Sequence, residues 1–143
     1  MNGAIRENHN QLVRPTDTVY FLGDLILCGS WIDIKSNFNG HFQYIWGNHD
    51  RKVFSDGTRP PYGMCIKHFS KKVYLTHFPK NLPKGFDVYF TAHHHDHYKF
   101  AIVEGIKVMN VGVDVWNFRP ISMKYAINEY FNKNNWLNVQ NNS

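Results

Sequence analysis

Nine histidines occur in this chain of 143 residues, and four of them lie within five positions. These four are His93, His94, His95 and His97. Asp24, Asn48 and His77 also follow short apolar stretches. A carboxylate, an amide oxygen and imidazoles form a ligand set that suits zinc, manganese or iron and not a thiolate-preferring metal. Each residue alone has a plain structural explanation, but the combined pattern predicts a metal site.

One of these polar residues or clusters directly follows each of four predicted strands. The strands therefore position the polar side chains. The stretches are short and rich in β-branched and aromatic residues, which is typical of buried strands. Polar groups beyond the ends of strands in an open sheet form a site. The predicted strands cover residues 18–22, 42–46, 72–76 and 86–92.

The remaining pattern predicts two helices and a hairpin. An amphipathic helix over 2–13 is stopped by Pro15, and a second helix, capped by Ser122, runs to about residue 131. The stretches 98–103 and 106–111 form the hairpin. The fold class expected is α/β (α+β), with strands and a few helices packed in layers around a sheet core.

Composition indicates one folded domain inside the cell. Apolar residues make up 43% and charged residues 19% of the chain, which excludes a disordered protein. We expect a single domain over 1–131 and a frayed, Asn-rich tail over 132–143. Only two cysteines, Cys28 and Cys65, are present, so a disulfide framework is excluded and a cytoplasmic location is expected. No apolar run approaches the ~20 residues of a membrane span, so no membrane partner is expected.

The net charge of +5 favours anionic partners in general. The lysines and arginines are scattered, which is typical of a solvated basic surface. A nucleic-acid-binding module would rest only on this charge and on aromatic residues that are better explained as core. Nucleic acid is therefore expected only as a substrate.

The polar groups also carry a resemblance to a known family. Four blocks are similar in order and spacing to the GD, GNH[DE], lone histidine and GHxH motifs of the calcineurin-like metallophosphoesterases. The blocks are Gly23-Asp24, Gly47-Asn48-His49-Asp50, Thr76-His77 and Ala92-His93-His94-His95. Residues 110–120 resemble the closing segment of the small prokaryotic and phage-type members. The resemblance covers residues 1–130, and the 47–50 block is its most specific part.

The resemblance implies two metal ions on the rim of a two-sheet β-sandwich flanked by helices. Asp24 would bridge both ions, Asn48, His77 and His93 would complete the ligands of one, and His95 would bind the other. Manganese is expected first, with iron, zinc, nickel and magnesium left open. His97 in place of His95 is an alternative register.

The implied activity is a metal-dependent phosphoesterase that hydrolyses a phosphomonoester or phosphodiester by a metal-bound hydroxide. Two cations roughly 3.5–4 Å apart can hold the attacking and leaving oxygens. His49 resembles the general acid that protonates the departing alkoxide, and Asp50 would orient its imidazole. Loops over 55–62 and 80–84 are the candidates for contacting the rest of the phosphate-ester substrate.

The chain departs from the family pattern at its start and at Ala92. No Asp-x-His motif precedes the first predicted helix, where a βα unit of ~30 residues is expected. His9 falls within that helix and does not replace the motif, so the second ion keeps only Asp24 and His95. Ala92 stands where the family has glycine.

Two consequences of the missing motif stay open. A missing strand leaves a sheet edge to be covered. Either the sequence is shortened relative to a functional protein, or another chain fills the edge, or the sheet is rearranged; the first two are favoured, and the second makes a homo-oligomer through that edge an expectation. The alternative function is a catalytically impaired or inactive protein of the same fold that binds a partner or a single ion.

Overall fold

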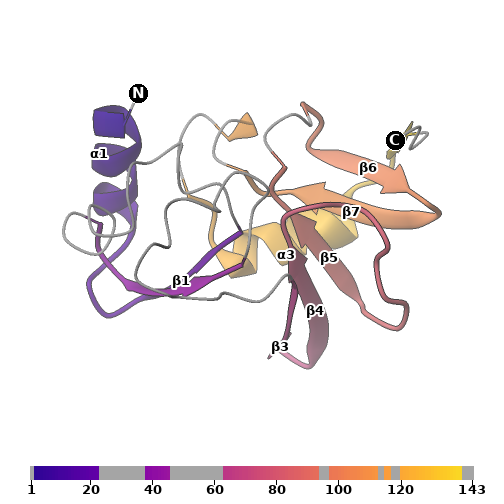
Figure 1. The fold of residues 1–143 in the computed structure, drawn as a ribbon, viewed down its shortest axis with the longest axis horizontal. Coiled ribbons are helices and arrows are strands. Elements are labelled where there is room, and N and C mark those ends of the chain that lie inside the picture. Colours follow the sequence, from indigo (N-terminus) through magenta and orange to yellow (C-terminus); the bar gives the residue numbers. More distant parts are fainter. Residues whose placement is uncertain are drawn as a thin grey trace.

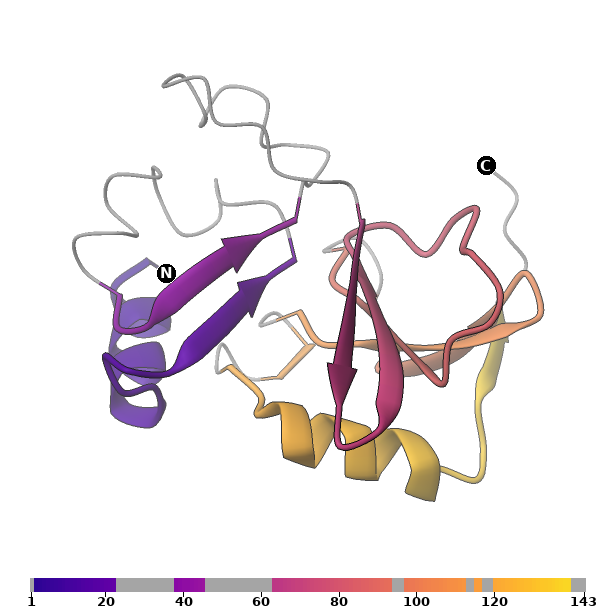
Figure 2. The ribbon, with the colours of Figure 1, turned by 90° about the horizontal axis from the view of Figure 1, so that it is seen from below.

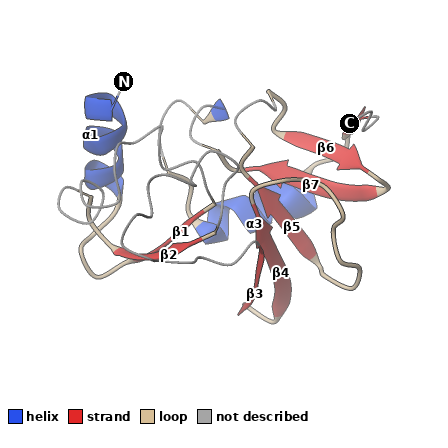
Figure 3. Ribbon diagram, viewed as in Figure 1, coloured by secondary structure: helices blue, strands red, loops and turns tan. Residues whose placement is uncertain are grey.

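The computed structural model describes residues 2–22, 38–45, 63–93, 97–112, 115–116 and 120–139. Helix α1 and a two-stranded sheet lie at one end of the molecule, and a six-stranded sheet with helix α3 lies at the other (Figure 1). Figure 3 shows the same arrangement by type of secondary structure. The elements are α1 (Asn2–Leu12), β1 (Thr18–Phe21), β2 (His41–Tyr44), β3 (Gly63–His68), β4 (Lys71–Thr76), β5 (Val88–Thr91), β6 (Phe100–Val103), β7 (Ile106–Asn110), α3 (Met123–Asn132) and β8 (Leu137–Val139).

The two sheets match the predicted fold class, a mixed α/β protein with two sheets and few helices. In the small sheet β1 and β2 are parallel, so both strands end at the same edge. In the large sheet the strand order is β3-β4-β5-β7-β6-β8. Strands β4, β5 and β7 are parallel neighbours, whereas β3 and β6 run antiparallel to β4 and β7. Among the described residues, no helix is long and apolar enough to cross a membrane.

The main core lies between α3 and one face of the large sheet (Figure 2). Helix α3 buries Ala126, Ile127 and Tyr130 there, and Ser122 caps its start by accepting a hydrogen bond from the N–H of Tyr125. Leu22 and Ile45, which follow β1 and β2, belong to the same core. Both sheets are therefore joined through one apolar cluster. Its strand residues are Val73, Leu75, Val88, Phe90 and Met109.

The turn at Asn39-Gly40 joins α1 to the small sheet. The side chain of Asn39 donates to the carbonyl of Val13 (3.0 Å), and its N–H donates to Oδ1 of Asn10 (2.8 Å). Gly40 has a φ of +114°, and a Cβ there would lie 2.7 Å from Cγ2 of Val19. Glycine is required at this position because both the backbone conformation and the available space exclude a side chain.

The elements predicted from the sequence are confirmed with small shifts of their ends, and two strands were missed. Strand β3 was not predicted. The expectation that the tail frays from residue 132 is wrong at β8, which pairs in parallel with β6. The reason is tertiary: the Trp136 ring packs against Phe100 (5.3 Å between centroids) and Tyr130 (5.0 Å), and so brings β8 to the sheet edge.

Candidate metal centre

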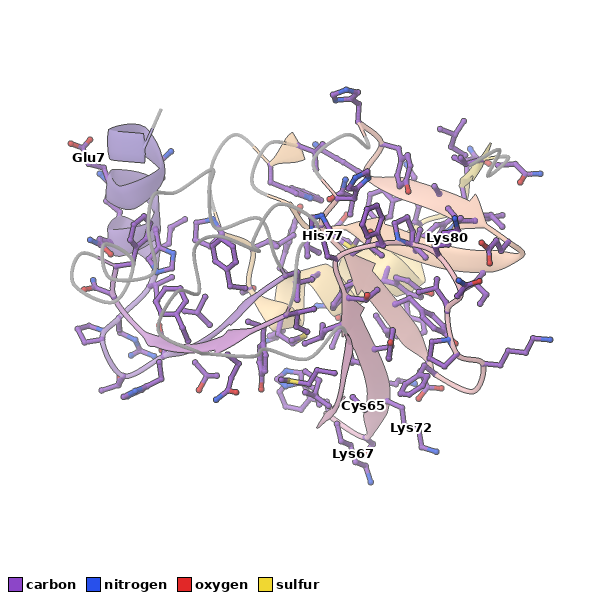
Figure 4. The ribbon with its side chains drawn as sticks, viewed as in Figure 1. Glu7, Cys65, Lys67, Lys72, His77 and Lys80 are labelled. Atoms are coloured by element: carbon purple, nitrogen blue, oxygen red, sulfur yellow. The ribbon has the colours of Figure 1, made fainter. Side chains whose placement is uncertain are left out.

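Two of the predicted metal ligands, His77 and His93, lie at the carboxyl ends of neighbouring parallel strands. His77 directly follows β4, and His93 comes two residues after β5. Because β4 and β5 are parallel, both histidines reach the same edge of the sheet. The N–H of Ala92 donates to the carbonyl of His77 (3.3 Å), so the two segments are also joined beyond the strands. Figure 4 shows His77 at the end of β4 that lies away from the β3–β4 turn.

His77 is held by the backbone that ends the first strand. Its side chain is 1% exposed, and Nδ1 lies 2.8 Å from the carbonyl oxygen of Leu22. A carbonyl can only accept, so Nδ1 carries the proton and Nε2 carries the lone pair. This is the tautomer that a metal-binding imidazole needs, with its other nitrogen anchored to a backbone oxygen. Leu22 precedes Asp24 by two residues, so the contact also ties His77 to the segment that leads into the Gly23-Asp24 block.

The two imidazoles lie edge to face. Their ring centroids are 5.3 Å apart, the ring planes are at 89°, and Nε2 of His93 is buried. Imidazole nitrogens bind ions such as zinc at about 2.0–2.1 Å, so two rings that share one ion have centroids about 5 Å apart. The observed separation suits both a shared ion and ordinary edge-to-face packing of two rings. Two imidazoles at one sheet edge are donors of the type that the predicted metal site requires.

Phe78, which the sequence analysis did not single out, packs against both histidines. Its ring centroid lies 4.4 Å from that of His93 and 5.2 Å from that of His77, and its side chain is 40% exposed. The ring restricts the rotation of both imidazoles and shields one side of the pair from water. Apart from its place next to His77, no pattern in the sequence marked Phe78.

Buried polar groups also end the third parallel strand. Asn110 is fully buried at the end of β7, where its Oδ1 accepts from the N–H of Gly112 (2.9 Å). Its carbonyl accepts from Nε1 of Trp116 (2.7 Å). These bonds fix the start of the 110–120 segment next to β5.

Thr91, on β5, is fully buried, and its Oγ1 has no hydrogen-bond partner within the described part of the chain.

Most of the predicted site lies outside the described residues. This is the case for the metal-ligand candidates Asp24, Asn48 and His95 and for the catalytic candidates His49 and Asp50. With only two candidates described, the described ranges contain no group of three or more metal-binding side chains. His97, the alternative to His95, is exposed.

His9 packs between helix α1 and the start of the small sheet. Its Nε2 donates to the carbonyl of Asn39 (2.7 Å), and its ring stacks on Phe42 with centroids 5.6 Å apart. The ring of Phe38 meets it edge to face. Burial lowers the pKa of His9 below its usual value, and the bond to Asn39 opposes this in part. The contacts agree with the expectation that His9 does not take the place of the family's Asp-x-His motif.

Comparison with solved structures supports the fold. The chain is similar to a protein of unknown function, AQ665 from Aquifex aeolicus, with a TM-score of 0.63 and 21% identity over 86% of this chain and 81% of that one. It is also similar to a single mutant of Vps29 from Entamoeba histolytica (TM-score 0.51, 22% identity, 77% of this chain and 63% of that one). A third structure is a novel archaeal phosphodiesterase (TM-score 0.51, 20% identity, 78% and 74%). Vps29 and the phosphodiesterase have the metallophosphoesterase fold, so the resemblance is confirmed for the fold.

Comparison of sequences identifies a relative. No family model matches the chain. The uncharacterized protein MJ1445 from Methanocaldococcus jannaschii is 35% identical over 137 residues, which span 89% of this chain and 73% of the relative. The identity extends over most of both proteins, and the chain therefore belongs to the family of MJ1445.

Proposed function

We propose that this protein is a metal-dependent phosphoesterase that hydrolyses a phosphomonoester or a phosphodiester. The observation that carries the proposal is the pairing of His77 with His93 at the ends of β4 and β5. The hydrogen bond from Nδ1 of His77 to the carbonyl of Leu22 sets the tautomer in which Nε2 carries the lone pair, as a metal-binding imidazole requires. His93 adds a second imidazole at the same sheet edge, 5.3 Å from His77 between ring centroids.

The residues that would hold two divalent ions are those of the motif blocks. Asn48, His77 and His93 would bind one ion, His95 would bind the other, and Asp24 would bridge them. A carboxylate can bridge because its two oxygens offer several lone pairs. Asn48 adds an oxygen ligand without negative charge, so an anionic phosphate is repelled less than it would be by a carboxylate. We propose manganese as the first metal to test and the cytoplasm as the location.

His49 and Asp50 would perform the proton transfer. When bound, the metal ions would supply positive charge for the phosphoryl oxygens and lower the pKa of water at the site. His49, next to a proposed ligand, would donate a proton to the departing alkoxide oxygen. Asp50 would orient the imidazole of His49 and favour its protonated form. The fold likeness to an archaeal phosphodiesterase supports testing phosphodiesters first.

The test combines metal content with hydrolysis. Elemental analysis of the protein loaded with manganese should give one tightly held ion per chain, and a second should be lost on dialysis. Hydrolysis of bis-p-nitrophenyl phosphate and p-nitrophenyl phosphate should depend on the added metal. Fewer than one ion per chain together with no turnover would instead support the non-catalytic binding protein.

Variants separate the proposed roles. Asp24→Ala should lose both metal and turnover, whereas His49→Ala should lose turnover, about 10²-fold or more, and keep the metal. His41→Ala is the matched control, because His41 is an exposed histidine at the start of β2, outside the motif blocks. Identical behaviour of Asp24→Ala and His49→Ala would contradict this division of roles.

A further inference from the structure

Three lysines lie over aromatic rings around the carboxyl end of α3. The Nζ atom of Lys71 is 4.9 Å from the centroid of Phe131, that of Lys133 is 5.1 Å from Phe100, and that of Lys107 is 5.5 Å from Trp136. All three lysines are exposed. A lysine stacked on a ring holds its charge in a fixed place and still presents it to solvent.

The rings form one continuous cluster. Trp136 contacts Phe100 and Tyr130, and Tyr130 contacts Phe131, with centroids 5.5 Å apart. Lys71, the first residue after the two-residue β3–β4 turn, reaches the Phe131 ring at the end of α3, so the turn residue Phe69 lies two residues along the chain from this cluster. We name this region the lysine–aromatic surface. It comprises Phe69, Lys71, Lys107, Phe131, Lys133 and Trp136.

Phe69 is unfavourable for folding where it stands. It is 74% exposed, and it forms a two-residue turn with Ser70 in which both residues have positive φ, 47° and 66°. Such turns favour Asn-Gly, because bulky side chains rarely adopt this conformation. A large exposed ring at a strained position is favoured neither by the turn nor by solubility, which makes Phe69 a candidate for binding. Its ring meets that of His68 edge to face, 4.4 Å away.

We propose that the lysine–aromatic surface binds single-stranded nucleic acid. The ammonium groups of Lys71, Lys107 and Lys133 would neutralise backbone phosphates, and the exposed faces of Phe69 and Phe131 would stack on bases. Phe131 is 49% exposed, and the ammonium group of Lys71 lies over its ring. A stacking ring and a cation within 5 Å are the two groups that one nucleotide of a single strand requires.

The residues around the surface fit a nucleic acid better than an acidic peptide. Asn132, Asn134 and Asn135 are exposed beside Lys133, and amide side chains can pair with the edges of unstacked bases. An acidic peptide would use the lysines and would not need exposed rings and amides. Glu129, one turn before Lys133, is the acidic residue on the same helix.

The surface is separate from the histidine pair, and the inference does not rest on the proposed function. Lys71 begins β4 and His77 follows its end, so the two lie about 20 Å apart along the strand. Figure 4 shows Lys72, the neighbour of Lys71, near the turn and His77 at the far end of β4. Binding can therefore be measured without any metal and without turnover.

The experiment is fluorescence anisotropy of the full chain with labelled oligo(U) and oligo(dT) of about 20 nucleotides in EDTA. We expect affinity to fall as salt rises from about 50 to 200 mM. Combining Lys71→Gln, Lys107→Gln and Lys133→Gln should weaken binding at least tenfold and reduce the salt slope by about 2. Phe69→Asn and Phe131→Leu should each weaken it by about fivefold or more.

The matched control removes three positive charges from lysines outside the lysine–aromatic surface. Lys80, Lys84 and Lys99 are exposed lysines outside the surface, and their combined change to Gln should reduce affinity less than threefold. Equal losses in the two triple variants would overturn the proposal, because net charge alone would then explain binding. No binding at low salt, or tighter binding of labelled polyglutamate than of oligo(U), would also overturn it. Loss of phosphoester hydrolysis in His77→Ala with unchanged oligonucleotide binding would agree with two separate sites.

Discussion

The Nδ1 atom of His77 donates a hydrogen bond to the carbonyl oxygen of Leu22, 2.8 Å away, and so joins the end of the six-stranded sheet to the end of the two-stranded one. This single bond has two effects. It satisfies a buried backbone oxygen between the sheets, and it fixes which imidazole nitrogen keeps its lone pair. The two effects can be separated by substitution.

His77→Asn should keep the first effect and lose the second. The amide nitrogen of asparagine can take the place of Nδ1, but nothing replaces Nε2. We expect the free energy of unfolding to change by less than about 1 kcal/mol, while bound manganese falls. His77→Leu should lose the metal and also cost about 1–3 kcal/mol, because the carbonyl of Leu22 would be left without a donor. Urea unfolding of the metal-free proteins and elemental analysis measure both quantities; equal stability of the two variants would show that the bond is unimportant.

Acid should destabilise the protein through His9. Burial lowers its pKa below the usual 6.5, so below that pH the unfolded chain binds more protons than the folded one. The stability that His9 provides is present above pH 6.5 and is lost as the pH falls through the lowered folded pKa. His9→Gln should keep a donor to the carbonyl of Asn39 and remove the titration. Urea unfolding between pH 5 and 8 should show a weaker pH dependence in His9→Gln, by at most about 1.4 kcal/mol per pH unit; parallel curves would contradict this assignment.

Local patterns in the sequence were sufficient for most of the fold. Strands β4 and β5 could be predicted because Val73, Leu75, Val88 and Phe90 form short apolar stretches. Strand β3 could not, because its side chains are only half-buried or exposed and it begins with Gly63, whose open face is covered by the ring of Tyr74. Strand β8 has no apolar pattern of its own, since it depends on Trp136 and on the free edge of β6.

The candidate site, like the fold, could be predicted from the sequence only in part. The convergence of His77 and His93 was predictable, because parallel strands bring their carboxyl ends together. The anchor on Leu22 was not predictable, because a backbone carbonyl leaves no signal in the sequence. The covering ring of Phe78 was likewise missed, since an aromatic residue beside a histidine has no distinctive pattern. The roles of Asp24, Asn48, His49, Asp50 and His95 and self-association through a sheet edge stay predictions.

Gly40→Ala should destabilise the protein more than Gly85→Ala does. Both glycines have positive φ, +114° and +96°, so alanine is strained at either position. At Gly85 nothing lies within 4 Å of an added Cβ, whereas at Gly40 it would lie 2.7 Å from Cγ2 of Val19. We expect a cost of about 1 kcal/mol at Gly85 and about 2–3 kcal/mol at Gly40. Thermal and urea unfolding compare the two, and equal costs would mean that the side chain of Val19 moves aside freely.

Replacing the β3–β4 turn should stabilise the fold. Phe69→Asn with Ser70→Gly gives the pair that a two-residue turn with positive φ at both positions prefers. We expect a gain of about 1 kcal/mol in the free energy of unfolding. Phe69→Leu is the control, because it keeps an apolar side chain in the same strained conformation and should give no gain. A loss of stability in the Asn-Gly variant would show that Phe69 contributes to folding, which would remove the strain argument for its role in binding.

Trp136→Ala should release β8 from the sheet. The indole ring contacts Phe100 and Tyr130, and its Nε1 donates to the carbonyl of Lys133 (3.0 Å). Loss of a partly buried tryptophan should cost about 2 kcal/mol or more, and the amides of β8 should lose their protection from hydrogen exchange. Trp136→Phe keeps a ring and loses only the hydrogen bond, so it should cost about 1 kcal/mol and leave β8 protected. If β8 stays protected in Trp136→Ala, then its pairing with β6 is sufficient to hold it, and the indole ring is not the cause of order in this tail.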